Sequence, residues 1–454
     1  MRDPLRCRLA VRAAWRRWCA GRRGGGPGSG IQSRLQPTLG TASRIAQLAC
    51  AFRRGTHTFA RNSRLAGPVR LIVTEPNTDA EADLTQTLLD GADVGPLFSP
   101  LTIAGLKLKN RWVMAPMTRQ FSPGGVPGAN VADYYGRRAA SLGLLITEGT
   151  YVDESSGPSD RVPRFFGAAS LAGWRKVAEA VHAADGAIFP QLWHLGAGRK
   201  PGSGPYPDTP VISPSGIDAT GNPVAEPATA AQLEATAASF AAAAVAAKEA
   251  GFDGVELHGA HGYLLDQFHW QATNRRTDAY GGDIKGRVRF SAEVVAAVRA
   301  ATGPDFPIAF RFSQWKGSDY NAKIAADPEE LASFLSSLVV AGVSIFHAST
   351  RRYWLPAFDG SDRTLAGWTR HLSGLPVIAV GSVGVPSAFR AVADEGKQPT
   401  LSLAPLVDLL ERGEFDLVAA ARAVLADPQW AAKVAAGDLP QIRPYDKSAD
   451  AELY

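Results

Sequence analysis

The chain has 454 residues, 45% of them hydrophobic, and a formal net charge of +5, so it is a globular sequence long enough to bury a substantial core. Residues 1–70 hold fifteen arginines, no lysine and one acidic residue, and so carry a charge of +14. Residues 71–454 therefore carry a net charge of +5 minus +14, or −9. All three cysteines also lie in the basic segment, which excludes a disulfide framework, a cysteine nucleophile and thiolate-held zinc or iron–sulfur from the rest of the chain.

Residues 1–90 are expected to form an Arg-rich extension outside the folded domain, disordered or derived from a mis-assigned start. Its Arg-rich, acid-poor composition matches a mitochondrial transit peptide. We favour a translated upstream reading frame, because the Arg, Gly and Ala bias runs on for some seventy residues without settling into a pattern. The remainder is expected in the cytoplasm, or in the mitochondrion if the leader is genuine. Neither a nucleic-acid partner nor a membrane partner is expected, because interleaved aromatics and an uninterrupted apolar span are both lacking.

Short apolar runs and helical patterns alternate along the chain from Gly95 onward. The predicted strands cover residues 111–117, 143–149, 187–194, 253–259, 307–313, 343–349, 376–382 and 416–422. The predicted helices cover residues 131–141, 171–184, 231–250, 285–301, 328–341 and 423–436. The segment between residues 376 and 416 is poorly patterned, and "EGKQPTLSLAPL" (395–406) is expected to be a loop insertion.

Uninterrupted apolar strands separated by helices indicate a parallel sheet covered on its outer face. Eight such units in about 350 residues favour a closed (β/α)8 TIM barrel over residues 91–454 rather than an open doubly wound sheet. A glycine-rich dinucleotide fingerprint is also missing after the first strand. Because chemistry in this architecture lies at the C-terminal ends of the strands, the polar residues there are the candidates: Thr118, Glu148, Gln191, His194, His258, His261, Arg311, His347, Gly381, Ser382 and Arg422.

The stretch "ELHGAHGYLLDQFHW" (256–270) holds three of the eight histidines of the chain. A helix or tight turn after the fourth strand would place His258 and His261 on one side, with Tyr263 close behind. Two such imidazoles can bind a metal, donate hydrogen bonds to an oxyanion or relay protons. The metal alternative is a hydrolase or lyase with His194, His258 and His347 as ligands. Donation is favoured, because no HxH pair follows the first strand and no acid is clearly placed to bridge metals.

The last two strands end in "VGSVG" (380–384) and "AR" (421–422). Backbone amides at the turns after strands seven and eight form the usual phosphate site of these barrels. A phosphate would therefore meet Gly381, Ser382, Ala421 and Arg422. Arg311, at the end of the fifth strand, would instead meet a large planar polar ligand across the barrel mouth.

Five segments together resemble the Old Yellow Enzyme family of flavin-dependent NAD(P)H oxidoreductases. They are "LFSPLTIAGLKLKNRWVMAPMTR", "QLWHLG", "ELHGAHGYLLDQFHWQATNRRTDAYGG", "FRFSQW" and the final "VGS…AR", in the family's order over roughly residues 96–440. The resemblance implies an FMN cofactor, reduced by NADPH or NADH, that passes hydride to a small-molecule activated alkene such as an α,β-unsaturated carbonyl compound. A homo-oligomer is compatible with such a barrel.

The resemblance also implies roles for single residues. His258 and His261 match the pair that hydrogen-bonds the substrate oxygen, and Tyr263 matches the acid that protonates the α-carbon. The positions that match flavin contacts are Pro116, Met117, Thr118, Gly149, Gln191, Arg311, Gly381, Ser382, Ala421 and Arg422. Trp193 would wall the substrate pocket, and Arg351 and Tyr353 of "STRRYWLPAFDG" (349–360) would set specificity for the nicotinamide cofactor or an acidic substrate. Ala421 departs from the family, which usually has glycine there, and alanine allows fewer backbone conformations.

Overall fold

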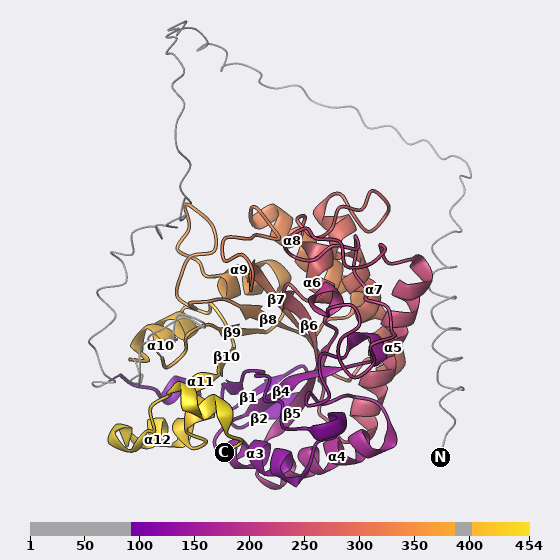
Figure 1. Ribbon diagram of the computed structural model, residues 1–454. Coiled ribbons are helices and arrows are strands. Elements are labelled where there is room, and N and C mark those ends of the chain that lie inside the picture. The colour runs from indigo at the N-terminus through magenta and orange to yellow at the C-terminus, as the bar shows by residue number, and fades with distance from the viewer. Residues whose placement is uncertain (1–91, 386–401) are drawn as a thin grey trace, which may run out of the picture.

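A computed structural model describes residues 92–385 and 402–454 of the chain (Figure 1). The expected Arg-rich extension, residues 1–90, and most of the expected insertion at residues 395–406 lie outside the described residues. Eight parallel strands form a closed barrel in the order β10-β3-β4-β5-β6-β7-β8-β9, which confirms the predicted TIM barrel. The strands are β3 (Trp112–Met114), β4 (Leu144–Tyr151), β5 (Ala187–Trp193), β6 (Val255–His261), β7 (Ile308–Lys316), β8 (Ile345–Ser349), β9 (Val377–Val380) and β10 (Leu417–Ala420).

The barrel strands alternate between an outer face under the helices and an inner face, because successive side chains of a strand point to opposite sides. In β3, Trp112 and Met114 join the outer hydrophobic cluster, whereas Val113 joins the inner one. The inner cluster also takes Leu144, Ala187, Phe189, Ala309, Ile345, Ile378, Leu417 and Ala419. Both faces are therefore apolar, which explains why the strands read as continuous hydrophobic runs.

A hairpin that the sequence did not predict contributes to this inner cluster. The strands β1 (Leu101–Ile103) and β2 (Leu106–Leu108) pair antiparallel, and buried Ile103 and Leu108 pack with Leu144 and Leu417, the first residues of their strands. A short helix, α2 (Gly95–Phe98), precedes the hairpin. Apolar side chains thus close the N-terminal end of the barrel and leave the polar residues at the other end.

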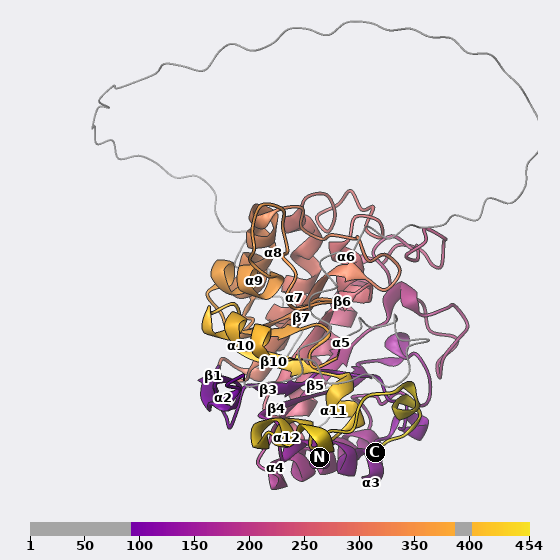
Figure 2. The ribbon, with the colours of Figure 1, turned by 90° about the vertical axis from the view of Figure 1, so that its left-hand side faces the viewer.

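The helices cover the outside of the barrel, as Figures 1 and 2 show. Five predicted helices are present within a few residues of their expected bounds: α3 (Ala129–Ala139), α4 (Ala168–Ala183), α5 (Ala230–Glu249), α7 (Ile284–Thr302) and α8 (Pro328–Ala341). Among the described helices, α5 alone has the length and apolar composition of a membrane span. Its buried side chains include Leu233 and Phe240 of the hydrophobic core, as expected for a helix packed on a barrel.

The last predicted helix, residues 423–436, was wrong as one element. The chain forms α11 (Arg422–Ala426) and α12 (Trp430–Ala436), and Asp427 between them is extended, with φ −130° and ψ 104°. A residue before proline is disfavoured in helical conformation, so Pro428 accounts for the break. Both helices lie beside α3 in the two views, where the Arg138 guanidinium donates to the carbonyls of Val424 and Leu425.

Three further helices were not predicted: α6 (Leu264–His269), α9 (Leu365–Ser373) and α10 (Ala404–Glu411). The first residues of α10 fall in the expected insertion at residues 395–406, so its end is helical rather than loop. Helix α6 starts one residue after Tyr263, which is its N-cap. This short helix packs against α7 and directs the chain away from the histidine pair.

Candidate active site

His258 and His261 come together at the C-terminal end of β6, but not through the expected helix or turn. Both belong to the strand itself. His258 pairs with Arg311 of β7, whereas His261 pairs with Lys316, so β7 uses two more residues than β6 over this interval. The irregularity and the left-handed backbone of His261, with φ +64°, bring the two rings to one side. Their centroids lie 5.2 Å apart at 88°.

The structure fixes which nitrogen of His258 carries the proton. Its Nδ1 accepts a hydrogen bond from the backbone N–H of Ala260 at 3.3 Å, so the proton of the neutral ring lies on Nε2. Burial lowers the pKa of His258 well below its ordinary value, and Arg311 and His347 lower it further. The ring is therefore a neutral donor near pH 7.

His261 is held at several atoms. Its Nε2 lies 2.8 Å from the hydroxyl oxygen of Ser349, and its backbone N–H donates to Oγ of Ser313 at 3.1 Å. Burial also lowers the pKa of His261 well below its ordinary value, with Arg311, His258 and Lys316 adding to the effect. Both rings are consequently neutral hydrogen-bond donors, the type of group that stabilises a developing oxyanion without already carrying charge.

Two aromatic side chains pack around His258. The ring of Trp193 lies nearly parallel to His258 at 6.3 Å, and Tyr263 packs edge-on against both, at 4.9 Å from Trp193 and 5.0 Å from His258. A Cβ atom on Gly149 would lie 2.6 Å from the Trp193 ring. The small residue expected beneath a flavin is therefore also required by the tryptophan. The structure brings Trp193, His258, His261 and Tyr263 into one group.

Glu256, which the sequence interpretation missed, is the centre of a buried polar network. Its Oε1 accepts from Nε2 of Gln191 at 2.8 Å, and its Oε2 lies 2.6 Å from Nδ1 of His347. Glu256 and His347 are fully buried and Gln191 is nearly so. The contact fixes the amide of Gln191, since its nitrogen faces Glu256 and its carbonyl oxygen is turned to accept from another group.

Arg311 lies at the same end of the barrel, 7% exposed. One guanidinium nitrogen donates to Ser349 Oγ at 3.4 Å, whereas its buried Nε has no partner in the described part of the chain. Burial lowers the pKa of Arg311, and Glu256 opposes that effect. A buried N–H without a partner is unfavourable. The Nε–H of Arg311 is therefore suited to donate to an acceptor on a bound molecule.

The four predicted phosphate residues lie at the ends of neighbouring strands. Strands β9 and β10 pair in parallel, so Gly381 and Ser382 follow one strand, and Ala421 and Arg422 follow the next. Ala421 has φ −113° and ψ −86°, which lies outside the main α and β regions, although its negative φ is not one that requires glycine. The two turns lie on the same rim as the histidines, because Ser349, the partner of His261, pairs in register with Val380.

The end of β3 continues through Pro116, Met117 and Thr118, which are at least partly exposed. The next backbone N–H groups, of Arg119 and Gln120, donate to Oε2 of Glu148 at 2.8 and 3.1 Å. Glu148 thereby anchors the segment that carries Thr118.

The two residues predicted to set specificity, Arg351 and Tyr353, lie beside the phosphate turn after β9. The carbonyl of Arg351 accepts from the Ser382 hydroxyl, and the N–H of Tyr353 donates to the Gly381 carbonyl.

Arg351 and Tyr353 differ in their surroundings. The Arg351 guanidinium lies 3.8 Å from the ring centroid of Tyr320, whose ring packs 6.0 Å from Trp315, which in turn packs 4.6 Å from His261. Tyr353 is 7% exposed and packs edge-on against Trp354. Arg351 is thus linked to the histidine pair through a row of packed aromatic rings, whereas Tyr353 is part of the core. Substrate contact by either residue stays a prediction.

The metal alternative is not supported. Within residues 92–385 and 402–454, no group of three His, Cys, Asp or Glu side chains is placed to hold a metal ion. His194 accepts the N–H of Gly196 at Nδ1 and contacts Ser155 at Nε2. His347 contacts Glu256 instead. The set of His194, His258 and His347 is therefore not assembled as metal ligands.

The sequence and the fold of the chain match known proteins. The NADH:flavin oxidoreductase / NADH oxidase family matches residues 96–440. The chain belongs to this family, that of Old Yellow Enzyme. The match covers the barrel with all the site residues above, which confirms the resemblance drawn from the five motifs.

Individual relatives agree with this assignment. The chain is 35% identical over 360 residues to an NADH oxidase of Thermoanaerobacter brockii, covering 76% of this chain and 52% of that protein. It is 37% identical over 304 residues to the chanoclavine-I aldehyde reductase of Penicillium roqueforti, covering 65% of this chain and 81% of the relative. Among solved structures, morphinone reductase matches with a TM-score of 0.65 and 29% identity, over 78% of this chain and 92% of that chain. The chain spans about half the length of the first curated relatives it matches.

The residues present fit the FMN that the family's name implies. The oriented carbonyl oxygen of Gln191 and the unpartnered Nε–H of Arg311 offer one acceptor and one donor on the same barrel rim, as the polar edge of a flavin pyrimidine ring requires. The two turns after β9 and β10 offer backbone amides, and Arg422 a guanidinium, for a phosphate. The donor set is therefore suited to a phosphorylated, planar, hydrogen-bonding cofactor.

Proposed function

We propose that this protein is an FMN-dependent NAD(P)H oxidoreductase that reduces the carbon–carbon double bond of α,β-unsaturated carbonyl compounds or similarly activated alkenes. The observation that carries the proposal is the group of two neutral imidazole donors with a tyrosine edge-on beside them, on the same barrel rim as the phosphate turns. FMN, when bound, supplies the hydride that it has accepted from NADPH or NADH.

We assign roles to the chain's own residues from the family resemblance, and their geometry supports these roles. His258, through Nε2–H, and His261 hold the carbonyl oxygen of the substrate. Because both rings are neutral, their hydrogen bonds strengthen as that oxygen becomes enolate-like, which lowers the barrier for addition at the β-carbon. The Tyr263 hydroxyl gives a proton to the α-carbon, which completes the net addition of a hydride and a proton to the double bond. Trp193 packs against both His258 and Tyr263 and so bounds the substrate on that side.

Residues on the neighbouring strands hold the cofactor in this proposal. Gln191 and Arg311 bind the pyrimidine end, with Glu256 fixing the orientation of Gln191. Pro116, Met117 and Thr118 lie along the flavin, and Gly149 leaves room beneath it. Gly381, Ser382, Ala421 and Arg422 bind the phosphate.

The proposal is tested by the visible spectrum of the purified protein under anaerobic conditions. The protein should be yellow, NADPH or NADH should bleach it, and cyclohexenone should then restore the colour as the enone is reduced. Parallel titrations with the two nicotinamides determine which one reduces the flavin faster. A colourless protein that does not bind added FMN, or a bleached protein that cyclohexenone fails to reoxidise, would refute the proposal.

A further inference from the structure

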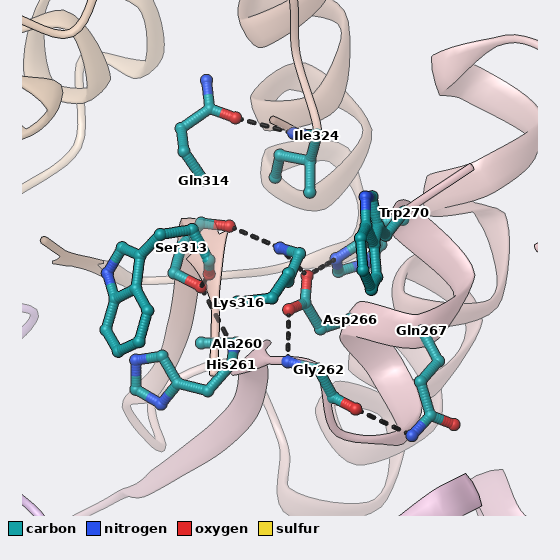
Figure 3. Close-up of polar contacts among 12 residues, drawn as sticks. Ala260, His261, Gly262, Asp266, Gln267, Trp270, Ser313, Gln314, Lys316 and Ile324 are labelled. Atoms are coloured by element: carbon teal, nitrogen blue, oxygen red, sulfur yellow. Dashed lines mark hydrogen bonds and ion pairs between the residues drawn. The ribbon is translucent and has the colours of Figure 1, made fainter. Parts of the chain in front are cut away.

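A buried ion pair contacts the turn at His261 and Gly262, where β6 ends. Nζ of Lys316, in β7, lies 2.8 Å from Oδ1 of Asp266, in α6, and neither side chain is exposed to solvent. The lysine also donates to the carbonyl of Ser313 at 3.0 Å. The second carboxylate oxygen of Asp266 accepts the backbone N–H of Gly262 at 2.7 Å. Figure 3 shows Asp266 between Lys316 on one side and Gly262 on the other.

The turn that Asp266 binds has an unfavourable backbone. His261 and Gly262 are consecutive left-handed residues, with φ +64° and +85°. A side-chain-bearing residue in this region is strained, by about 1–2 kcal/mol, and persists where surrounding contacts determine it. Asp266 accepts a hydrogen bond from the Gly262 N–H, which lies in the peptide between the two left-handed residues. This hydrogen bond is therefore at the centre of the turn that orients His261 and leads to Tyr263.

The lysine explains how a carboxylate can serve in this place. A buried carboxylate without a partner is strongly unfavourable, and loss of one member of a buried pair is far more damaging than neutral replacement of both. Lys316 also lies opposite His261 in the β6–β7 register. Through Asp266, it connects β7 to the Gly262 N–H just after the end of β6, where the registers of the two strands diverge. Burial lowers the pKa of Lys316, but Asp266 raises it.

We propose that the Lys316–Asp266 pair is the positioning device of the active-site turn. Asp266 fixes the Gly262 N–H and through it the direction of the His261 ring and the start of α6 at Tyr263. Lys316 compensates the charge that this acceptor carries. The inference rests on the proposed function in assigning His261 to the substrate oxygen, while the control of the turn itself is independent of the reaction.

Two double variants separate the acceptor from the charge. D266N/K316M removes both charges but keeps a side-chain oxygen for the Gly262 N–H, and the new amide nitrogen takes the place of Oδ1, which lies 3.5 Å from Nδ1 of His269. D266L/K316M removes the acceptor as well. D266A/K316M makes the same comparison with a smaller side chain should the leucine variant be insoluble. Arg289, whose side chain is exposed and pairs with Glu293, provides R289Q as a control outside the site.

Two measurements on the FMN-loaded protein report on the turn without turnover. Hydrogen exchange of the peptide covering residues 256–270 reports the protection of the Gly262 amide. Calorimetric titration with a phenolate, an anionic oxygen ligand, reports the donors of the histidine pair. We expect D266N/K316M and R289Q to stay within about threefold of wild type in both. D266L/K316M or D266A/K316M should lose about tenfold or more in phenolate affinity, as expected for loss of a buried hydrogen bond, together with amide protection.

Unchanged exchange and phenolate affinity in a folded variant without the acceptor would overturn the inference. An equal loss in D266N/K316M would also overturn it, since the charge rather than the acceptor would then matter. Cyclohexenone reduction by the wild type is measured alongside. If the wild type does not reduce the enone but the acceptor variants still lose amide protection, the proposed function fails and the positioning of the turn stands.

Discussion

The Nε2 atom of His261 lies 2.8 Å from the hydroxyl oxygen of Ser349, and the same oxygen receives a hydrogen bond from Arg311 at 3.4 Å. A guanidinium can only donate, so it occupies an acceptor position of the hydroxyl. The oxygen keeps a second lone pair and its own proton, so the contact with Nε2 of His261 holds the ring in either of its neutral tautomers. Ser349 thus links the residue proposed to bind the flavin to one of the two donors proposed to bind the substrate.

Replacing Ser349 with alanine should slow reoxidation by enones about tenfold while leaving reduction by NADPH within about twofold. The physical reason is that His261 loses the contact that holds its ring, and one such hydrogen bond contributes about 1 kcal/mol. Stopped-flow measurement of the two half-reactions checks the prediction. S349T keeps the hydroxyl on a strand position that suits a β-branched residue, and should restore most of the rate. Equal slowing of both half-reactions in S349A would contradict this role.

Replacing Tyr263 with phenylalanine should spare flavin reduction and slow alkene reduction by about 10²-fold or more, the usual contribution of a positioned general acid. The ring contacts with Trp193 and His258 do not need the hydroxyl, so the packing should survive. The measurement is the ratio of the two half-reaction rates with NADPH and cyclohexenone. Loss of flavin reduction in Y263F would show that the assigned role is wrong.

The barrel and the positions of its strand ends could be predicted from sequence, because hydrophobic runs and helix patterns follow local periodicity. Residues about 120 positions apart in the sequence, such as Gln191 and Arg311, could be assigned to one rim because parallel strands in a closed barrel end on the same side. The contacts between strands could not be predicted in this way. In the sequence, Ser349 is only a polar residue at the end of a predicted strand. The β6–β7–β8 register of the structure is what places it against His261.

The sequence does contain a sign that Glu256 is important, but hydrophobic periodicity alone does not reveal it. Glu256 stands inside an apolar strand, and a charged residue there requires a buried partner. Its partners, Gln191 and His347, come from two other strands, so only the three-dimensional structure identifies them. The expected turn between His258 and His261 was wrong for a related reason. The extra residues that bring the rings together lie in β7 rather than in the histidine segment.

Replacing Glu256 with glutamine should destabilise the protein and weaken FMN binding. The carboxylate accepts from Gln191 at one oxygen and contacts His347 at the other, whereas an amide offers one acceptor and one donor group. If the amide oxygen keeps Gln191, Nδ1 of His347 can accept the new N–H only by moving its own proton to Nε2, a buried atom without a partner in the described part of the chain. The free energy of unfolding should fall by about 1–3 kcal/mol, measured by urea denaturation followed by circular dichroism. The dissociation constant for FMN should rise, because an amide oxygen orients Gln191 through a weaker hydrogen bond than a carboxylate oxygen does. E293Q, in a largely buried acid outside the site, is the matched control, and unchanged FMN affinity in E256Q would contradict the assigned role.

Glu148 should make the stability of the folded protein depend on pH. Burial raises the pKa of its carboxyl from 4.5 to about 7, although the N–H groups of Arg119 and Gln120 favour the charged form. The folded protein therefore binds this proton more tightly than the unfolded chain does. Its contribution is fully present below about pH 4.5 and is lost as the pH rises through about 7, a change on the order of 3 kcal/mol for a group that is 2% exposed.

The difference between wild type and E148Q isolates this contribution, because other titrating groups are common to both proteins. Relative to E148Q, the wild type should lose stability between about pH 4.5 and 7 and change little above that range, as measured by urea unfolding at a series of pH values. The glutamine can still accept the N–H groups of Arg119 and Gln120 through its carbonyl oxygen, so the segment carrying Thr118 should keep its position. A wild type that gains stability relative to E148Q over this interval would show that the backbone donors outweigh burial, and would reverse the assigned sign.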